Sequence, residues 1–143
     1  MIYHHVLAAY DGSLVSEKAL QEAIKLVEKT PGSRLSVIHV ISRPILSFEG
    51  FGYVAPESYQ EKMQEYENAL LAQAKTLINS LPYSNVVVLH GDTATTILKY
   101  AHENKCSIIV MGSRGLGAIK EWVLGSVSHQ VVQKAQIPVL IIK

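Results

Sequence analysis

Short apolar runs alternate with amphipathic segments along the whole chain, and this alternation restricts the folds that the chain can adopt. The apolar runs cover residues 3–11, 34–41, 85–89, 107–111 and 139–143. They carry few polar side chains, as strands do when both faces of their sheet are buried. Strands that alternate with helices indicate one parallel sheet with helices on both faces. The sequence therefore predicts an α/β fold with five strands.

The segments between these runs have the apolar spacing of helices. In the first, Leu20, Ile24 and Val27 share one helical face, and charged residues lie on the opposite face. In the second, one face carries Met63, Tyr66, Leu70, Ala74 and Leu77. The predicted helices cover residues 13–30, 56–80, the later part of 91–105, and 126–135. Residues 42–55 lack a clean period and predict a long loop, a kind of segment that often covers or binds a ligand.

Composition excludes several classes of protein. A chain of 143 residues suits one domain over residues 1–143, and its net charge of +1 with dispersed Lys and Arg argues against nucleic acid as a partner. No apolar run approaches the ~20 residues that cross a bilayer, so we expect no membrane partner. The single Cys106 cannot form an intramolecular disulfide, and residues 1–13 lack the pattern of a signal peptide. We therefore expect a cytoplasmic protein.

Residues 111–126, MGSRGLGAIKEWVLGS, concentrate four of the nine glycines of the chain between two apolar stretches. In open parallel sheets, ligands bind beyond the carboxyl ends of the strands, and a glycine there permits positive φ or close approach of a ligand to backbone amides. Ser126 is placed to be the N-cap of the helix that follows, whose first amides attract anions. Gly112, Gly115 and Gly125 together with Ser126 thus favour an anion site over a tight turn alone, which remains the alternative.

The familiar phosphate motifs do not match this stretch. Gly112 and Gly117 have the spacing of a Walker loop, but Ala118 and Ile119 follow in place of Lys and Ser or Thr. A dinucleotide fingerprint that starts at Gly115 would need a third glycine where Lys120 stands. Neither motif is therefore predicted.

Catalytic and metal signals are weak. The six histidines have no ligand-like spacing to a cysteine or carboxylate, which argues against a metal site. Ser128 beside His129 is predicted to lie on the surface of a helix, and Cys106, with no base next to it in the sequence, is predicted to be an inert buried thiol. The sequence does not support catalysis, although slow ATP hydrolysis stays open.

Gly112 and Gly115 with two residues between them, followed after nine residues by Gly125 and Ser126, resemble the nucleotide-binding motif of the universal stress protein family. The likeness extends over nearly the whole chain, through YDGS at 10–13, VIHVI at 37–41, HGD at 90–92 and IPVLIIK at 137–143. The motif resembles that of the ATP-binding branch. The resemblance implies a Rossmann-like sheet of order 3-2-1-4-5, ATP binding, a stress-response role and homodimers joined through the last strand.

The resemblance also implies roles for individual residues. Asp11 would approach the ribose, Val40 and Ala9 the adenine, and the glycine motif the phosphates. The implied nucleotide-binding residues are Ala9, Asp11, Val40, Met111, Gly112, Gly115, Gly125, Ser126 and Val127. Any Mg²⁺ or Mn²⁺ would arrive with the phosphates, because Mg²⁺ needs few protein ligands.

Several alternatives stay open from the sequence. Asp11 could cap the first helix or stabilise a turn, and Val40 could be an ordinary core residue. The resident ligand could be ATP, ADP or AMP. Because the last strand would be an apolar edge strand if it lies outermost, the chain could also be a dimeric scaffold that recruits a protein partner through residues 42–55.

Overall fold

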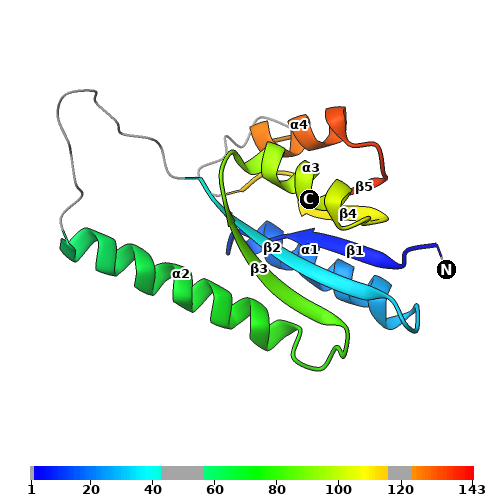
Figure 1. Cartoon of the computed structure of the whole chain (residues 1–143), viewed down its shortest axis with the longest axis horizontal. Helices are drawn as coiled ribbons and strands as arrows, with labels where there is room; N and C mark the ends of the chain where they lie inside the picture. The colour runs from blue at the N-terminus through cyan, green and yellow to red at the C-terminus, as the bar shows by residue number, and fades with distance from the viewer. Residues whose placement is uncertain (1, 43–56, 116–123) are drawn as a thin grey trace.

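The computed structural model describes residues 2–42, 57–115 and 124–143, which fold as alternating strands and helices (Figure 1). The strands are β1 (His5–Ala9), β2 (Arg34–Ile41), β3 (Ser84–His90), β4 (Ile108–Gly112) and β5 (Val139–Ile142). The helices are α1 (Leu14–Glu28), α2 (Glu57–Leu77), α3 (Thr93–Glu103) and α4 (Ser126–Lys134). Each predicted element is present, with ends that differ from the prediction by up to three residues.

The five strands form one parallel sheet in the order β3-β2-β1-β4-β5. This confirms the order 3-2-1-4-5 that the family resemblance implied. At the centre of the sheet, Ala8 of β1 pairs with Val37 of β2 on one side and Val110 of β4 on the other. The strand exits of β1 and β4 therefore lie side by side, which the spacing of apolar residues alone did not reveal.

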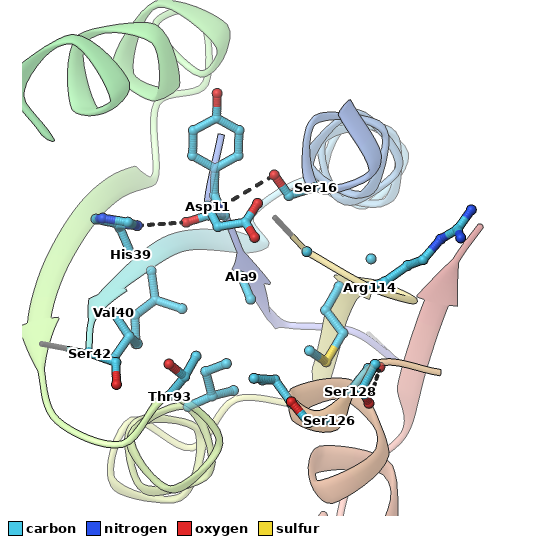
Figure 2. Close-up of a pocket in the computed structure, with 18 of the residues that line it drawn as sticks. Ala9, Asp11, Ser16, His39, Val40, Ser42, Thr93, Arg114, Ser126 and Ser128 are labelled. Atoms are coloured by element: carbon cyan, nitrogen blue, oxygen red, sulfur yellow. Dashed lines mark hydrogen bonds between the residues drawn. The ribbon is translucent and has the colours of Figure 1, made fainter. Parts of the chain in front are cut away.

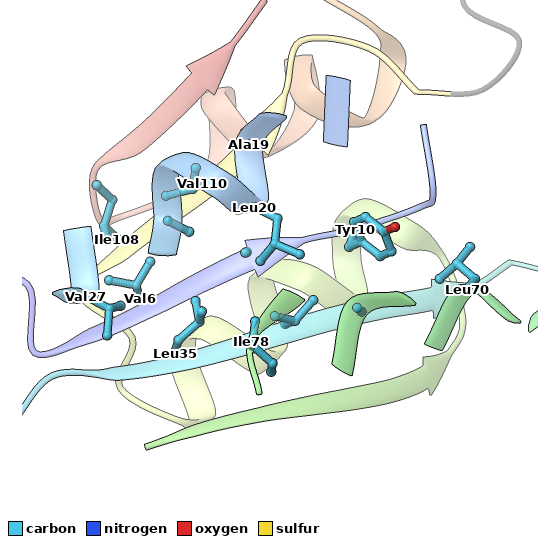
Figure 3. Close-up of a cluster of buried hydrophobic side chains, with 14 residues drawn as sticks. Val6, Tyr10, Ala19, Leu20, Val27, Leu35, Leu70, Ile78, Ile108 and Val110 are labelled. Atoms are coloured by element: carbon cyan, nitrogen blue, oxygen red, sulfur yellow. The ribbon is translucent and has the colours of Figure 1, made fainter. Parts of the chain in front are cut away.

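Apolar layers cover both faces of the sheet. On one face, α1 and α2 pack against the strands, and buried residues such as Leu20, Leu35 and Leu70 fill the layer (Figure 3). On the other face, α3 and α4 contribute Ile97 and Val131, which pack against Leu7 of the central strand and its neighbours. Two buried faces explain why the strands are apolar almost throughout.

Only the later part of α2 packs on the sheet. Leu70 and Ala74 are buried, as the predicted face required, but Tyr66 is half-exposed. The predicted apolar face is thus only partly buried, because the first turns of α2 run past β3 and meet no strand (Figure 1). None of the helices within the described ranges has the length and apolar character needed to span a membrane.

Candidate functional site

A cavity of about 1150 Å³ lies at the carboxyl edge of the sheet, where β1 and β4 end (Figure 2). Helices α1, α3 and α4 all begin at this edge, so the positive ends of their dipoles point toward it. All nine residues implied by the family resemblance line this cavity: Ala9, Asp11, Val40, Met111, Gly112, Gly115, Gly125, Ser126 and Val127. The fold thus brings together three segments that are far apart in the sequence.

Asp11 is held in place by the turn between β1 and α1. Its Oδ1 accepts a hydrogen bond from the Ser13 amide at 2.9 Å, and its own amide donates to Ser16 Oγ at 3.3 Å. Ser13, not Asp11, is the N-cap of α1, since its hydroxyl accepts from the Ser16 amide at 3.1 Å. The turn therefore places the Asp11 carboxylate at the cavity without using it as a helix cap.

The second oxygen of Asp11 faces the loop that follows β4. A Cβ built on Gly115 would overlap Asp11 Oδ2, so no other residue fits at position 115 while Asp11 stays where it is. The carboxylate and the glycine motif therefore meet at the same point of the cavity. The strand order implied by the family resemblance had predicted that these two loops are neighbours.

The glycines of the motif are required because neighbouring protein atoms leave no room for a Cβ, and not because the backbone adopts positive φ. Gly12, Gly32 and Gly91 are the glycines with positive φ in the described residues, and Gly112, Gly115 and Gly125 are not among them. A Cβ on Gly112 would lie 2.6 Å from Val15 Cγ1 of α1, and one on Gly125 would lie 3.2 Å from Arg114 Cα. The interpretation that these three glycines supply positive φ was therefore wrong.

The first turn of α4 begins one residue earlier than a cap at Ser126 would place it. Gly125 occupies the N-cap position with φ −74° and ψ 172°, and Ser126 is the first residue of the helix. The prediction that Ser126 caps this helix was wrong, and no side chain caps it. As a result, the backbone amides of Ser126, Val127 and Ser128 donate no hydrogen bond to any of the described residues. The first amides of a helix have no partner within the helix itself.

Ser128 fixes this helix start on the end of β4. Its hydroxyl donates to the Ser113 carbonyl at 2.6 Å and lies 3.1 Å from the Gly125 carbonyl. The Gly125 amide donates to the same Ser113 carbonyl at 2.6 Å. Ser128 is 2% exposed, so its prediction as a surface residue was wrong. The hydroxyl faces inward because the helix start turns back over the strand.

Apolar residues form part of the cavity wall. They include Ala9 and Val40 (Figure 2), together with Ile38 of β2, Ile97 of α3 and Met111 of β4. Val40 is half-buried and lines the cavity, although it also packs against the core on that face of the sheet. This wall offers a slot for a flat, weakly polar group.

Sequence reasoning missed the contribution of α3 to the site. Thr93, the first residue of α3, lines the cavity, as do Ser42 after β2 and His129 of α4. The Gly91-Asp92 turn could have indicated this contribution. It follows β3, which pairs with β2, and it precedes α3 at the same edge of the sheet. Arg114 also lines the cavity. Gly117, Lys120, Trp122 and all of the predicted loop at 42–55 except Ser42 lie outside the described residues.

Two titratable groups near this edge have shifted pKa values. Hydrogen bonds from the Thr95 hydroxyl and amide lower the pKa of Asp92, the N-cap of α3. Burial raises the pKa of Tyr10, and the nearby Glu17 and Asp11 add to this effect.

In the part of the chain that the structure describes, no three His, Cys, Asp or Glu side chains gather as metal ligands. Among the residues that the structure describes, the cavity lining therefore offers one carboxylate, open amides and apolar side chains.

The fold is a doubly wound α/β fold, and its cavity lies at the carboxyl edge of the sheet, where proteins of this class bind ligands. The sequence model of the universal stress protein family matches residues 2–143. The chain is 35% identical to universal stress protein YxiE of Bacillus subtilis, over 99% of this chain and all of the relative. The chain therefore belongs to the universal stress protein family.

Solved structures share this fold. The structure of the hypothetical protein MJ0577 superposes with a TM-score of 0.83 at 26% identity, covering 100% of this chain and 97% of that protein. The universal stress protein from Archaeoglobus fulgidus in complex with dAMP superposes with a TM-score of 0.66 at 25% identity, covering 100% of both chains. The second of these relatives binds an adenine nucleotide.

Proposed function

We propose that this stress-response protein belongs to the ATP-binding branch of its family and holds the nucleotide between the loop after β1 and the loop after β4. The observation that carries the proposal is the cavity where the Asp11 carboxylate and the open amides of α4 meet. Nucleotide occupancy would then shift a conformational or partner equilibrium, which is how a regulatory protein without catalysis acts.

The chemistry of the cavity matches the three parts of a nucleotide. Ala9, Val40 and Met111 offer the apolar slot for adenine, and Asp11 is an acceptor for ribose hydroxyls. The open amides of Ser126 and Val127 suit a phosphate group, because a helix N-terminus combines free donors with a positive dipole end. The cavity volume of about 1150 Å³ is ample for such a ligand.

The dAMP complex of the A. fulgidus relative supports an adenine nucleotide as the class of ligand. ATP as the resident member of that class is our proposal, as is Mg²⁺ or Mn²⁺ bound through its phosphates. Asp11 is the one carboxylate among the described residues that line the cavity, so these residues cannot hold such an ion by themselves. The phosphates of the nucleotide would supply most of its ligands. When bound, the ion would neutralise phosphate charge, and the chain's own residues would position the nucleotide.

The direct test is to purify the chain without added nucleotide, heat-denature it and identify the nucleotide in the supernatant by chromatography. Titration calorimetry with ATP, ADP and AMP, each with and without Mg²⁺, then ranks the ligands. We expect release or binding of an adenine nucleotide. Absence of nucleotide together with no heat of binding for any of the three would refute the proposal, and phosphate release over time would reveal slow hydrolysis.

A proline at position 126 tests whether the phosphates use the α4 amides. Proline suits the first position of a helix, and Gly125 already has the extended backbone that a residue before proline needs. Ser126→Pro removes one amide donor while keeping the helix, so we expect ATP to bind about tenfold more weakly or worse, because a hydrogen bond to a charged group contributes about 1.5–3 kcal/mol.

Ser126→Ala is the matched control, because it removes the hydroxyl and keeps the amide. Calorimetry on both variants, with circular dichroism to verify the fold, separates the two groups. Equal ATP affinity of the proline variant and the wild type would place the phosphates elsewhere.

We also propose that residues 1–143 act as one domain that forms cytoplasmic homodimers through β5. This strand lies at the edge of the sheet, and its Leu140 side chain is 37% exposed. An apolar edge strand favours pairing with a second chain. Sedimentation equilibrium should give twice the mass of the chain, and Leu140→Lys should shift it toward the monomer. A monomeric wild type would contradict this part of the proposal.

A further inference from the structure

Helix α2 packs against the turn that carries Asp11, from the face of the sheet that α1 and α2 cover. Leu70 of α2 is 4% exposed and belongs to the same buried cluster as Tyr10, the residue before Asp11 (Figure 3). Ala9 and Val40 of the cavity wall pack against the cluster on the other face. Leu70 is not among the described residues that line the cavity, so it supports the turn from outside the site.

Hydrogen bonds hold the chain on either side of this turn. On the strand side, the Tyr10 amide donates to a carbonyl of β2 at 2.9 Å, and the Tyr10 carbonyl accepts from His39 Nδ1 at 3.0 Å. On the helix side, the Ser13 hydroxyl caps α1. Asp11 and Gly12 are the two residues between these anchors. Their backbone therefore determines where the Asp11 carboxylate points.

Gly12 is the residue of this turn with the widest choice of backbone angles. Its φ of +85° costs glycine little, but many other values would cost it equally little. One restraint is local, because Asp11 Oδ1 accepts from the Ser13 amide. The other comes from α2: a Cβ built on Gly12 would lie 2.9 Å from Leu70 Cδ1 and 3.7 Å from the Tyr66 hydroxyl oxygen. These two side chains fill the space beside Gly12.

The two contacts from α2 differ in how firmly they are held. Leu70 is buried in a packed cluster, where a side chain has fixed neighbours and little room to move. Tyr66 is 50% exposed, so its ring keeps more freedom. We therefore attribute the restraint on Gly12 chiefly to Leu70.

We propose that Leu70 is a positioning residue of the nucleotide site, which holds the turn at Gly12 so that the Asp11 carboxylate faces the ribose. Leu70 does not touch the nucleotide and acts through Asp11. The inference rests on the proposed function, because it takes Asp11 as the acceptor for a ribose hydroxyl. A displacement of α2 from the turn would release Gly12 and weaken nucleotide binding, although none of the described cavity residues belongs to α2.

Two alanine variants of buried aliphatic residues test the proposal. Leu70→Ala removes the methyl groups that face Gly12. Ile78→Ala is the matched control, because Ile78 is 5% exposed in the same cluster but lies at the other edge of the sheet. Its carbonyl accepts from the hydroxyl of Ser84, the first residue of β3, at 3.2 Å. Circular dichroism verifies the fold, and Leu70→Val, with the same effects at smaller size, replaces Leu70→Ala if that variant does not fold.

Titration calorimetry gives the first measurement. We expect Leu70→Ala to bind ATP about fivefold more weakly and Ile78→Ala to differ from the wild type by less than about twofold. Leu70→Met conserves the volume of the side chain and should restore wild-type affinity within about twofold. Tripolyphosphate has no ribose, so it should bind Leu70→Ala and the wild type equally. Equal weakening of ATP and tripolyphosphate would overturn the proposal.

A double-mutant cycle tests whether Leu70 acts through Asp11. In the Asp11→Ala background there is no carboxylate to position, so adding Leu70→Ala should change ATP affinity by less than about twofold. The same loss in both backgrounds would show that Leu70 acts by another route and would overturn the proposal. Wild-type ATP affinity of Leu70→Ala would overturn it as well.

Nitrogen-15 relaxation of the nucleotide-free protein separates this inference from the proposed function. The amides of Gly12 and Ser13 should have order parameters near about 0.85 in the wild type and in Ile78→Ala, and below about 0.6 in Leu70→Ala. Unchanged order parameters in Leu70→Ala overturn the inference even if ATP binds. A wild type that binds no nucleotide refutes the proposed function, and the order parameters then still decide whether Leu70 restrains the turn.

Discussion

The starts of α1 and α4 contain the same dipeptide, Gly-Ser, but use it in opposite ways. At α1, Gly12 has a φ of +85° and Ser13 is the N-cap, with its hydroxyl accepting from the Ser16 amide. At α4, Gly125 itself is the N-cap, and Ser126 lies inside the helix. The first helix start is therefore closed by its own side chains, and the second is open to the cavity.

The N-cap is the serine of the dipeptide at α1 and the glycine at α4, a shift of one residue. Nearby hydrogen bonds explain this shift. The Asp11 carboxylate accepts from the Ser13 amide, which fixes the tight turn at Gly12. The Gly125 amide instead donates to the Ser113 carbonyl at 2.6 Å, which leaves Gly125 extended. The comparison shows that a serine near a helix start becomes a cap, or leaves the first amides of the helix uncapped, according to what holds the residue before it.

The largest expected effect comes from making α4 resemble α1. Gly125→Asp places a carboxylate at the N-cap, where it can accept from the amides of Val127 and Ser128 and repel a phosphate. Because two donors to a charged group are withdrawn, we expect ATP affinity to fall by about a hundredfold or more, measured by calorimetry. Gly125→Ala is the control, since it adds the same Cβ, close to Arg114 Cα, without an acceptor. Equal losses in both variants would attribute the effect to crowding.

A smaller effect is expected at the closed helix start. Asp11→Asn keeps an oxygen that can accept from the Ser13 amide, so the turn and the stability should be retained. If Asp11 accepts from ribose, ATP should bind about tenfold more weakly, since one charge-assisted hydrogen bond is lost. Binding of tripolyphosphate alone should not weaken. Tighter binding of ATP would show instead that Asp11 lies beside the phosphates.

The smallest effects separate the two serines. Ser13→Ala removes the cap of α1 and should lower the free energy of unfolding by about 1 kcal/mol, measured by urea denaturation. Ser126→Ala removes no capping bond and should change stability by less than about 0.5 kcal/mol. Similar losses in both variants would mean that Ser126 has a capping role in solution.

Much of the fold and part of the site follow from particular sequence features. The apolar runs predicted β1 to β5, and the family resemblance supplied the strand order and the nine residues that line the cavity. Thr93 was missed because its role depends on α3 beginning beside β2. The contact of Leu70 with Gly12 was missed because α2 and the turn after β1 are far apart along the chain.

The sequence by itself determined which segments are strands and helices, because apolar spacing reflects which faces each element must bury. It also located the glycine motif at the end of a strand. Only the tertiary structure decided that Gly112 and Gly115 are needed for contact with Val15 and Asp11, and that α4 begins without a cap. These features arise from groups that are distant in the chain and meet only after the sheet has formed, so no local pattern records them.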